Sequence, residues 1–379
     1  MRYCAPPIHA VFSVLIGVII SLTALTFSFS KHEQTKFQEL AFVDGTSSFF
    51  ASYNGFQIHC NDVDDAKKCE DGFKKRGLSN AVLWLGNSQV HAINQYQVGQ
   101  KSMAEVLFHK LKDHDLDLLT FSQPNASLQE HYVLFEYFKR HLPLRFFLLP
   151  VVFDDTRETG IRPSIAKSFE DNVVSNELKQ TDIGKSILEA NQGQSEKDSD
   201  LAGVVNTTQE WSERVLNEFL KKNVSLWELR PEIRGRIFVG MYKLRNWIFG
   251  INPGTKRPKI LGRYNLNMLA LKALLQSARD DHINVLLYVV PIRQDVEIPY
   301  IAEEYSQFKN EVSLMAKNAG AFFVNLEDLV PAHLWGQKES TTIGRSNLEL
   351  DYMHFQEKGH YLLARDLYKN IIHIVRDEK

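Results

Sequence analysis

Short apolar runs alternate with segments of helical periodicity along most of the chain, and this alternation limits the folds open to it. The apolar runs occupy residues 81–85, 116–121, 145–153, 284–290 and 321–326. Apolar residues recur at helical spacing in 103–112, 127–141, 265–280, 301–318 and 356–375. Strands that alternate with helices form right-handed crossovers, and runs that are apolar throughout suit strands covered on both faces. The pattern therefore predicts an α/β fold with a mainly parallel sheet.

The interval of about 155–262 breaks this alternation and is interpreted as a helical insertion between core elements. Its first half is polar, and its second half contains a run, 230–250, in which basic and apolar side chains alternate. A helix of this kind either lies on an anionic membrane surface or packs its apolar side on the protein core. We favour the second interpretation, because any surface helix is amphipathic.

The run from Ala10 to Phe29 carries no charge, and about 20 apolar residues suffice to cross a bilayer as a helix. A cleaved signal peptide is the alternative, but its apolar region is normally shorter and ends at a small-x-small site. The residues after Leu25 fit such a site poorly. We therefore expect a cytoplasmic arm and transmembrane anchor over 1–30. A polar stalk and the segment leading into the domain follow over 31–79, and the main domain, which contains the insertion, spans 80–379.

Composition excludes several other classes of protein. The chain is 44% apolar with a formal net charge of −2, so it can bury a large core and is not built to coat nucleic acid.

Cys60 and Cys69 flank a polar stretch. In an oxidising compartment they would form a disulfide; otherwise they are two separate thiols. Two cysteines without an adjacent histidine pair do not make a zinc site, and we expect neither a metal nor a cofactor.

The first motif that carries chemistry is Gly86-Asn87-Ser88, which directly follows the apolar run 81–85. Ligands of open α/β sheets bind at the carboxyl ends of the strands. A serine that begins a helix there has its hydroxyl near backbone N–H groups, which can stabilise a developing oxyanion. The alternative is a plain turn with a helix cap, since Asn and Ser are both favoured caps.

The second motif is Asp351 and His354, three residues apart and immediately before the last helical segment. At this spacing a carboxylate can accept a hydrogen bond from one imidazole nitrogen and leave the other free to act as a base. An Asp-x-x-His pair alone is common by chance. With Ser88 it is more specific, because the two motifs can converge on one edge of a doubly wound sheet.

The order of these motifs resembles the SGNH (GDSL-like) hydrolase superfamily, whose first block is Gly-Asp-Ser and whose last block is Asp-x-x-His. Ser88 matches the family nucleophile, and Asp351 and His354 match the rest of its triad. The resemblance covers residues 80–155 and 265–375. It implies a three-layer αβα domain in which Ser88 attacks an ester or thioester carbonyl, His354 takes its proton and Asp351 orients His354.

This sequence departs from the family pattern at the oxyanion hole. Asn87 stands where the family has Asp and is itself a candidate for oxyanion or substrate binding, and no Gly-x-Asn-Asp block occurs. Asn125, after the second apolar run, is the nearest candidate, because its amide could donate to an oxyanion; otherwise it is a turn residue. Arg293, after the run 284–290, is a candidate for substrate binding.

Within the superfamily, the membrane helix, the large insertion and the late Asp-x-x-His are similar to the D-alanyl-lipoteichoic acid biosynthesis D protein and the alginate O-acetylation proteins. This resemblance implies an extracytoplasmic domain, periplasmic or on the cell surface, that transfers acyl groups to or from an envelope polymer. It implies an acylated polymer or activated acyl donor, and a membrane-bound O-acyltransferase, as partners. The alternatives are an esterase or deacetylase that releases the acyl group to water, and a non-catalytic scaffold.

Overall fold

A six-stranded parallel sheet forms the centre of the protein. The computed structural model describes residues 46–196, 255–339 and 348–377. Within them the strand order of this sheet is β10-β9-β8-β5-β7-β4, and every neighbouring pair is parallel. The strands are β4 (His59–Cys60), β5 (Asn80–Gly86), β7 (Leu116–Ser122), β8 (Leu144–Val151), β9 (Asn284–Val289) and β10 (Phe322–Asn325). This arrangement confirms the predicted α/β class with a mainly parallel sheet.

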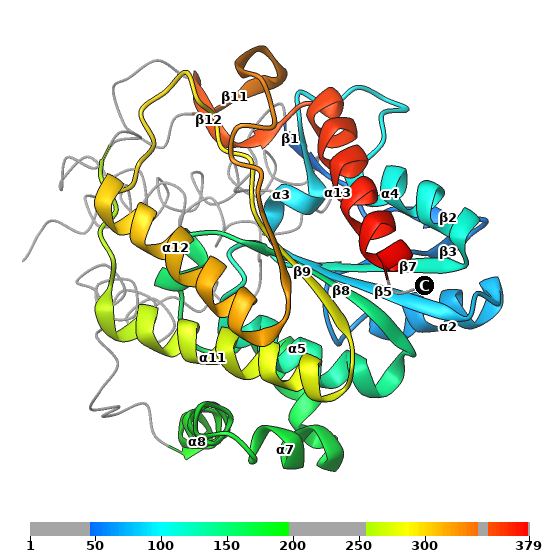
Figure 1. Cartoon of the computed structure of the whole chain (residues 1–379), viewed down its shortest axis with the longest axis vertical. Coiled ribbons are helices and arrows are strands. Elements are labelled where there is room, and N and C mark those ends of the chain that lie inside the picture. The colour runs from blue at the N-terminus through cyan, green and yellow to red at the C-terminus, as the bar shows by residue number, and fades with distance from the viewer. Residues whose placement is uncertain (1–45, 197–254, 340–347, 378–379) are drawn as a thin grey trace, which may run out of the picture.

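Helices cover both faces of the sheet (Figure 1). One face carries α4 (Met103–Leu111) and α13 (Glu357–Asp377). The other carries α2 (Ala66–Arg76), α5 (Leu128–His141), α11 (Leu261–Asp280) and α12 (Ala302–Ala319). The three layers that the sequence predicted are therefore present.

The side chains of β5 show how one strand serves both layers. Ala81, Leu83 and Leu85 are buried in the core under α5 and α11, whereas Val82 and Trp84 are buried in the core under α4 and α13. Successive side chains of a strand point to opposite faces, so a central strand must be apolar at every position. This is why the run 81–85 has no alternation of polar and apolar residues.

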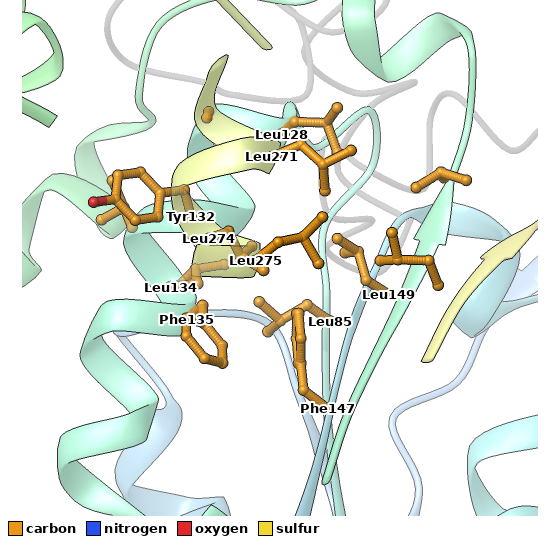
Figure 2. Close-up of a cluster of buried hydrophobic side chains, with 14 of the residues drawn as sticks. Leu85, Leu128, Tyr132, Leu134, Phe135, Phe147, Leu149, Leu271, Leu274 and Leu275 are labelled. Atoms are coloured by element: carbon orange, nitrogen blue, oxygen red, sulfur yellow. The ribbon is translucent and has the colours of Figure 1, made fainter. Parts of the chain in front are cut away.

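The core under α5 and α11 is the larger of the two clusters (Figure 2). Phe147 and Leu149 project from β8, and they face Phe135 of α5 and Leu271 and Leu275 of α11 in that view. Burial of each such side chain contributes about 1.5–3 kcal/mol. This packing fixes the two helices on the sheet and so fixes the loops that enter and leave them.

Local signals set the ends of these helices. Ser127 caps α5 in a reciprocal capping box with Glu130, which satisfies two backbone donors at the helix start. Ser102 caps α4. Helix α12 ends at Gly320 with φ 73°, a left-handed conformation in which a side chain would be strained.

The order of the strands reverses at β5. From β5 the chain runs to its neighbour β7 and then crosses back to β8 on the other side of β5. At such a switch point the loops after adjacent strands leave in opposite directions and open a crevice at the carboxyl ends. Residues that directly follow β5 therefore lie at the edge where a ligand can approach.

Several short elements surround this framework. Antiparallel pairs join β1 (Thr46–Ser48) to β6 (Ala92–Asn94), β2 (Ser52–Tyr53) to β3 (Phe56–Gln57), and β11 (Trp335–Glu339) to β12 (Leu348–Phe355). The described part of the predicted insertion contains the helical elements η3 (Asp154–Arg157), α6 (Pro163–Ala166), η4 (Lys167–Glu170), α7 (Asn172–Leu178) and α8 (Asp182–Glu196).

The segment 46–79, which we expected to lead into the domain, belongs with the sheet. It supplies the edge strand β4, which pairs with β7, and the helix α2, whose apolar side joins the core. Strand β4 has only two residues, too few to show a periodicity in the sequence. It belongs to the sheet because it pairs with β7.

Two sequence predictions concern segments outside the described residues: the membrane anchor over 10–29 and the basic run 230–250. Among the helices that the structure describes, none has the length and apolar character needed to span a membrane.

A disulfide joins Cys60 of β4 to Cys69 of α2. The two residues are nine apart in sequence. A disulfide that closes such a loop lowers the entropy of the unfolded chain and so raises the free energy of unfolding by about 3 kcal/mol. We expect the double variant Cys60→Ser/Cys69→Ser to lower the free energy of unfolding by about this amount, as measured by urea denaturation without reductant. In reductant the two proteins should differ much less, and equal midpoints without reductant would contradict the prediction.

Candidate active site

Ser88 begins a short helix, α3 (Ser88–His91), two residues after the end of β5. Asn87 caps this helix: its Oδ1 accepts from the backbone N–H of Gln89 at 3.0 Å. The Asn87 Nδ2 donates to Asp155 Oδ2 at 3.3 Å, at the start of the segment that follows β8. Burial raises the pKa of Asp155 well above its usual value. The Asn87 amide is thus buried and directed into the protein, which gives it a capping role in place of the oxyanion role that the sequence suggested.

Asp351 and His354 lie on the strand β12, which ends at Phe355, directly before α13 as the sequence predicted. The strand pairs with β11 through a register irregularity between Trp335 and Gln337. The Asp351 Oδ1 accepts from the backbone N–H groups of Met353 at 2.9 Å and His354 at 3.1 Å. These two bonds turn the carboxylate toward the imidazole of His354.

The three side chains form one line of hydrogen bonds. The His354 Nδ1 lies 2.9 Å from Asp351 Oδ2, and the His354 Nε2 lies 3.0 Å from Ser88 Oγ. The carboxylate fixes the tautomer with a proton on Nδ1, so Nε2 accepts the proton of the Ser88 hydroxyl. Ser88 and His354 come from segments 266 residues apart.

Burial and charge differ along this line. The side chain of Asp351 is 2% exposed and that of His354 is 14% exposed; Ser88 is half-buried. Burial alone would raise the pKa of Asp351, but the electrostatic interaction with His354 and the hydrogen bonds from His354 and Met353 outweigh it and hold that pKa well below its usual range. The carboxylate thus stays ionised at neutral pH, and the serine faces solvent.

The carboxylate has one further donor, which the sequence did not reveal. The Asn94 Nδ2, on β6, lies 3.3 Å from Asp351 Oδ2 and 3.1 Å from the carbonyl oxygen of Gln337. Asn94 is fully buried. Because α3 runs directly into β6, the segment that carries Ser88 also carries this donor.

The other predicted site residues are placed elsewhere. Asn125 is exposed with φ 51° and lines a cavity of about 300 Å³, whose lining does not include Ser88. Arg293 is buried: its guanidinium binds both carboxylate oxygens of Asp295 at 2.6 and 3.0 Å and the carbonyl oxygen of Gly336 at 2.9 Å. Its charge is used within the protein, so Arg293 ties the segment after β9 to β11 in place of binding a substrate.

A second serine also contacts imidazoles. Ser122 ends β7, and its Oγ lies 2.7 Å from His59 Nε2 and 2.7 Å from His91 Nδ1. All three residues are buried. Burial lowers the pKa of His59 to about 3 and that of His91 well below its usual value, so both imidazoles are neutral at physiological pH. This cluster is inaccessible and belongs to the core behind α3.

Within residues 46–196, 255–339 and 348–377, no group of three or more His, Cys, Asp or Glu side chains could hold a metal ion.

Comparisons with known proteins add little to this geometry. No family model matches the chain, and no curated protein matches it significantly. Among solved structures, it is similar to a proposed acylhydrolase from Bacteroides fragilis NCTC 9343, at 9% identity and TM-score 0.34 over 78% of this chain and 87% of that one. It is also similar to a GDSL-like lipase from Bacteroides thetaiotaomicron VPI-5482, at 9% identity and TM-score 0.33 over 79% of this chain and 90% of that one. Likenesses this weak carry no argument, so fold and chemistry rest on the geometry described above.

Gly336 gives a test of the contact between Asn94 and Asp351. A methyl group at Gly336 would overlap the side-chain oxygen and carbon of Asn94. We expect Gly336→Ala to displace Asn94 and then Asp351, and to lower ester turnover on the order of 10²-fold. If the effect passes through Asn94, the double variant Gly336→Ala/Asn94→Ala will be no slower than Asn94→Ala alone. Additive losses would show that Gly336 acts by another route.

Proposed function

We propose that this chain is a serine-dependent acyl-transfer enzyme of the SGNH (GDSL-like) type. The observation that carries the proposal is the unbroken line of hydrogen bonds from Ser88 through His354 to Asp351, with the serine partly open to solvent and the carboxylate buried. A nucleophile, a base and an orienting group within hydrogen-bond reach of one another are the arrangement that nucleophilic acyl transfer requires.

In the proposed reaction the Ser88 Oγ attacks an ester or thioester carbonyl while His354 Nε2 takes the hydroxyl proton. The bond to the leaving alcohol or thiol then breaks, and His354 returns the proton to that group. The tetrahedral intermediate carries its negative charge beside the backbone N–H of Ser88, which is the oxyanion donor that we propose. Water or an acceptor hydroxyl attacks the acyl-enzyme in the second half of the reaction.

A non-catalytic scaffold is the weaker alternative. A scaffold has no need for an imidazole held between a buried carboxylate and a partly exposed hydroxyl, at distances of 2.9 and 3.0 Å. A serine-reactive fluorophosphonate separates the two hypotheses: we expect it to add once to the wild-type chain, at Ser88. A folded chain that does not react would support the scaffold.

We further propose that the domain works outside the cytoplasm on acyl groups of a cell-envelope polymer, beside a membrane-bound O-acyltransferase. The uncharged run 10–29 supports an anchor, and the Cys60–Cys69 disulfide supports an oxidising compartment. These features do not distinguish transfer from release of the acyl group to water, since both reactions share the acyl-enzyme.

An isotope-labelled activated acyl ester separates the two reactions. With a hydroxyl-bearing envelope polysaccharide present, a transferase moves the label to the polymer, whereas a hydrolase releases it as the free acid at the same rate with or without the polymer. We expect label on the polymer. Release of free acid alone would overturn transfer and leave the proposed acyl-enzyme in place.

A further inference from the structure

We infer that Gln89 is a positioning residue that holds the strand bearing the general base against the helix bearing the nucleophile. This inference rests on the proposed function of Ser88 and His354. Gln89 directly follows Ser88, and Met353 directly precedes His354. The Gln89 Nε2 donates to the carbonyl oxygen of Met353 at 2.8 Å. One hydrogen bond therefore joins the immediate neighbours of the two reacting side chains.

The same amide nitrogen also donates to the carbonyl oxygen of Pro291, just beyond β9, at 2.9 Å. An amide NH₂ group has two hydrogens, and both are used here on backbone carbonyls. Gln89 is 2% exposed; its bond to Pro291 is buried and its bond to Met353 is partly buried. Three segments that are far apart in sequence, namely α3, the end of β9 and β12, thus meet at one side chain.

The bond between Ser88 and His354 could not hold these segments together by itself. It joins two partly exposed side chains, for which water competes, and its net contribution to stability is modest. The Gln89 bonds come from a buried side chain and reach backbone atoms, so they fix the position of β12 and not only a rotamer. Removal of the amide would leave both carbonyls without this donor and would let β12 move away from α3.

A shift of this kind affects rate more than binding. Gln89 is 2% exposed, so we expect it not to contact a bound acyl group, but proton transfer needs the Ser88 Oγ and the His354 Nε2 within hydrogen-bond reach. A displacement of about 1 Å can cost on the order of 10²-fold in rate. We therefore expect Gln89→Met, which keeps the length of the side chain and removes both donors, to lower kcat by about 10–100-fold with KM changed less than about twofold.

The test compares the rate and the end point of fluorophosphonate labelling, by intact mass, in the wild-type chain, Gln89→Met and Gln129→Met. Gln129 on α5 is a matched control, because it is 6% exposed and no hydrogen bond is recorded for its buried Nε2 atom. We expect Gln89→Met to reach full stoichiometry at a rate about 10–100-fold below wild type, and Gln129→Met to label at the wild-type rate.

The possible outcomes discriminate between explanations. A wild-type rate in Gln89→Met would overturn the inference. So would a reduced end point with a normal rate for the remaining molecules, because that result indicates a role in folding alone. If the wild-type chain does not label, the proposed function itself fails, and no reacting serine remains to be positioned.

Gln89→Glu provides a second variant should Gln89→Met fail to fold. A protonated glutamate can still donate one hydrogen bond to Met353 or Pro291, whereas an ionised one repels both carbonyl oxygens. Its labelling rate relative to wild type should therefore fall as the pH rises. A ratio that stays constant across the pH range would contradict the role of the amide donors.

Discussion

The variant Ser88→Ala is expected to lose acyl-ester turnover by at least about 10³–10⁴-fold while keeping the native fold. The substitution removes the atom that forms the acyl-enzyme, so neither hydrolysis nor transfer can proceed through a covalent intermediate. The cost in stability should be small, under about 1 kcal/mol. Ser88 is half-buried, and the His354 Nε2 that loses its partner can bind water.

Turnover of a small activated ester and the mass of the fluorophosphonate adduct both measure this effect. Ser122→Ala is the matched control, because the Ser122 Oγ, like that of Ser88, lies within hydrogen-bond distance of imidazole nitrogens, at 2.7 Å from each of two. Ser122 is 1% exposed and cannot be reached by a substrate. We expect this control to lose some stability, about 1–2 kcal/mol, and to label normally at Ser88. Full activity in a well-folded Ser88→Ala variant would refute the assignment of the nucleophile.

The long elements could be predicted from the sequence because their causes are local. A strand such as β5 or β8 is buried on both faces and must be apolar throughout, and a covering helix such as α5 must repeat apolar residues at helical spacing. The edge strand β4 has two residues and no pattern. It exists because β7 offers backbone hydrogen-bonding groups to it: His59 pairs with Thr120 and Cys60 with Phe121, far along the chain, and a local sequence pattern cannot reveal such a partner.

The residues of the site likewise fall into those that the sequence reveals and those that it does not. Ser88, Asp351 and His354 could be proposed because their spacing is a local motif, and the structure brings them together. The roles of Gln89 and Asn94 could not, since their partners on β12 are 264 and 257 residues away. Any buried glutamine or asparagine would look the same in the sequence.

Asn125 illustrates how a correct placement along the chain can still mislead. It does follow β7 at the carboxyl edge of the sheet, as the sequence indicated. However, the Arg162 guanidinium binds the carbonyl oxygens of Pro124 and Asn125 and holds this loop beside the segment after η3. Arg162, which is distant in sequence, determines where the loop lies. The turn residues of the loop therefore could not by themselves predict its position.

The variant Asp351→Asn is expected to lower turnover by about 10⁴-fold, although it preserves the shape of the side chain. The carboxylate accepts four hydrogen bonds, two from backbone N–H groups and one each from His354 Nδ1 and Asn94 Nδ2. In one orientation the new amide NH₂ faces His354 and Asn94, so the imidazole proton moves to Nε2 and the base can no longer accept the Ser88 proton. In the other orientation it faces the two backbone donors.

The difference in stability between the wild type and Asp351→Asn should depend on pH with a definite sign. The folded-state pKa of Asp351 is depressed, so its ionised form stabilises the native state above the unfolded-state value, about 3.9. That contribution is lost as the pH falls through the folded-state value. The free energies of unfolding of wild type and Asp351→Asn should therefore differ most above about pH 4 and converge in more acidic solution. Urea denaturation at a series of pH values measures this difference.

Asp117→Asn separates loss of catalysis from loss of stability. Asp117 is a fully buried carboxylate that binds Arg76 Nε at 2.7 Å, and it lies near the amino end of β7, the opposite edge of the sheet from Ser88. Its amide variant should also lose stability, because it leaves a buried guanidinium without its counter-ion. Its turnover should stay within about twofold of wild type, since the Ser88–His354 geometry is untouched. If both variants lost turnover in proportion to their stability, the effect of Asp351 would be structural, and a role for its carboxylate in setting the His354 tautomer would be excluded.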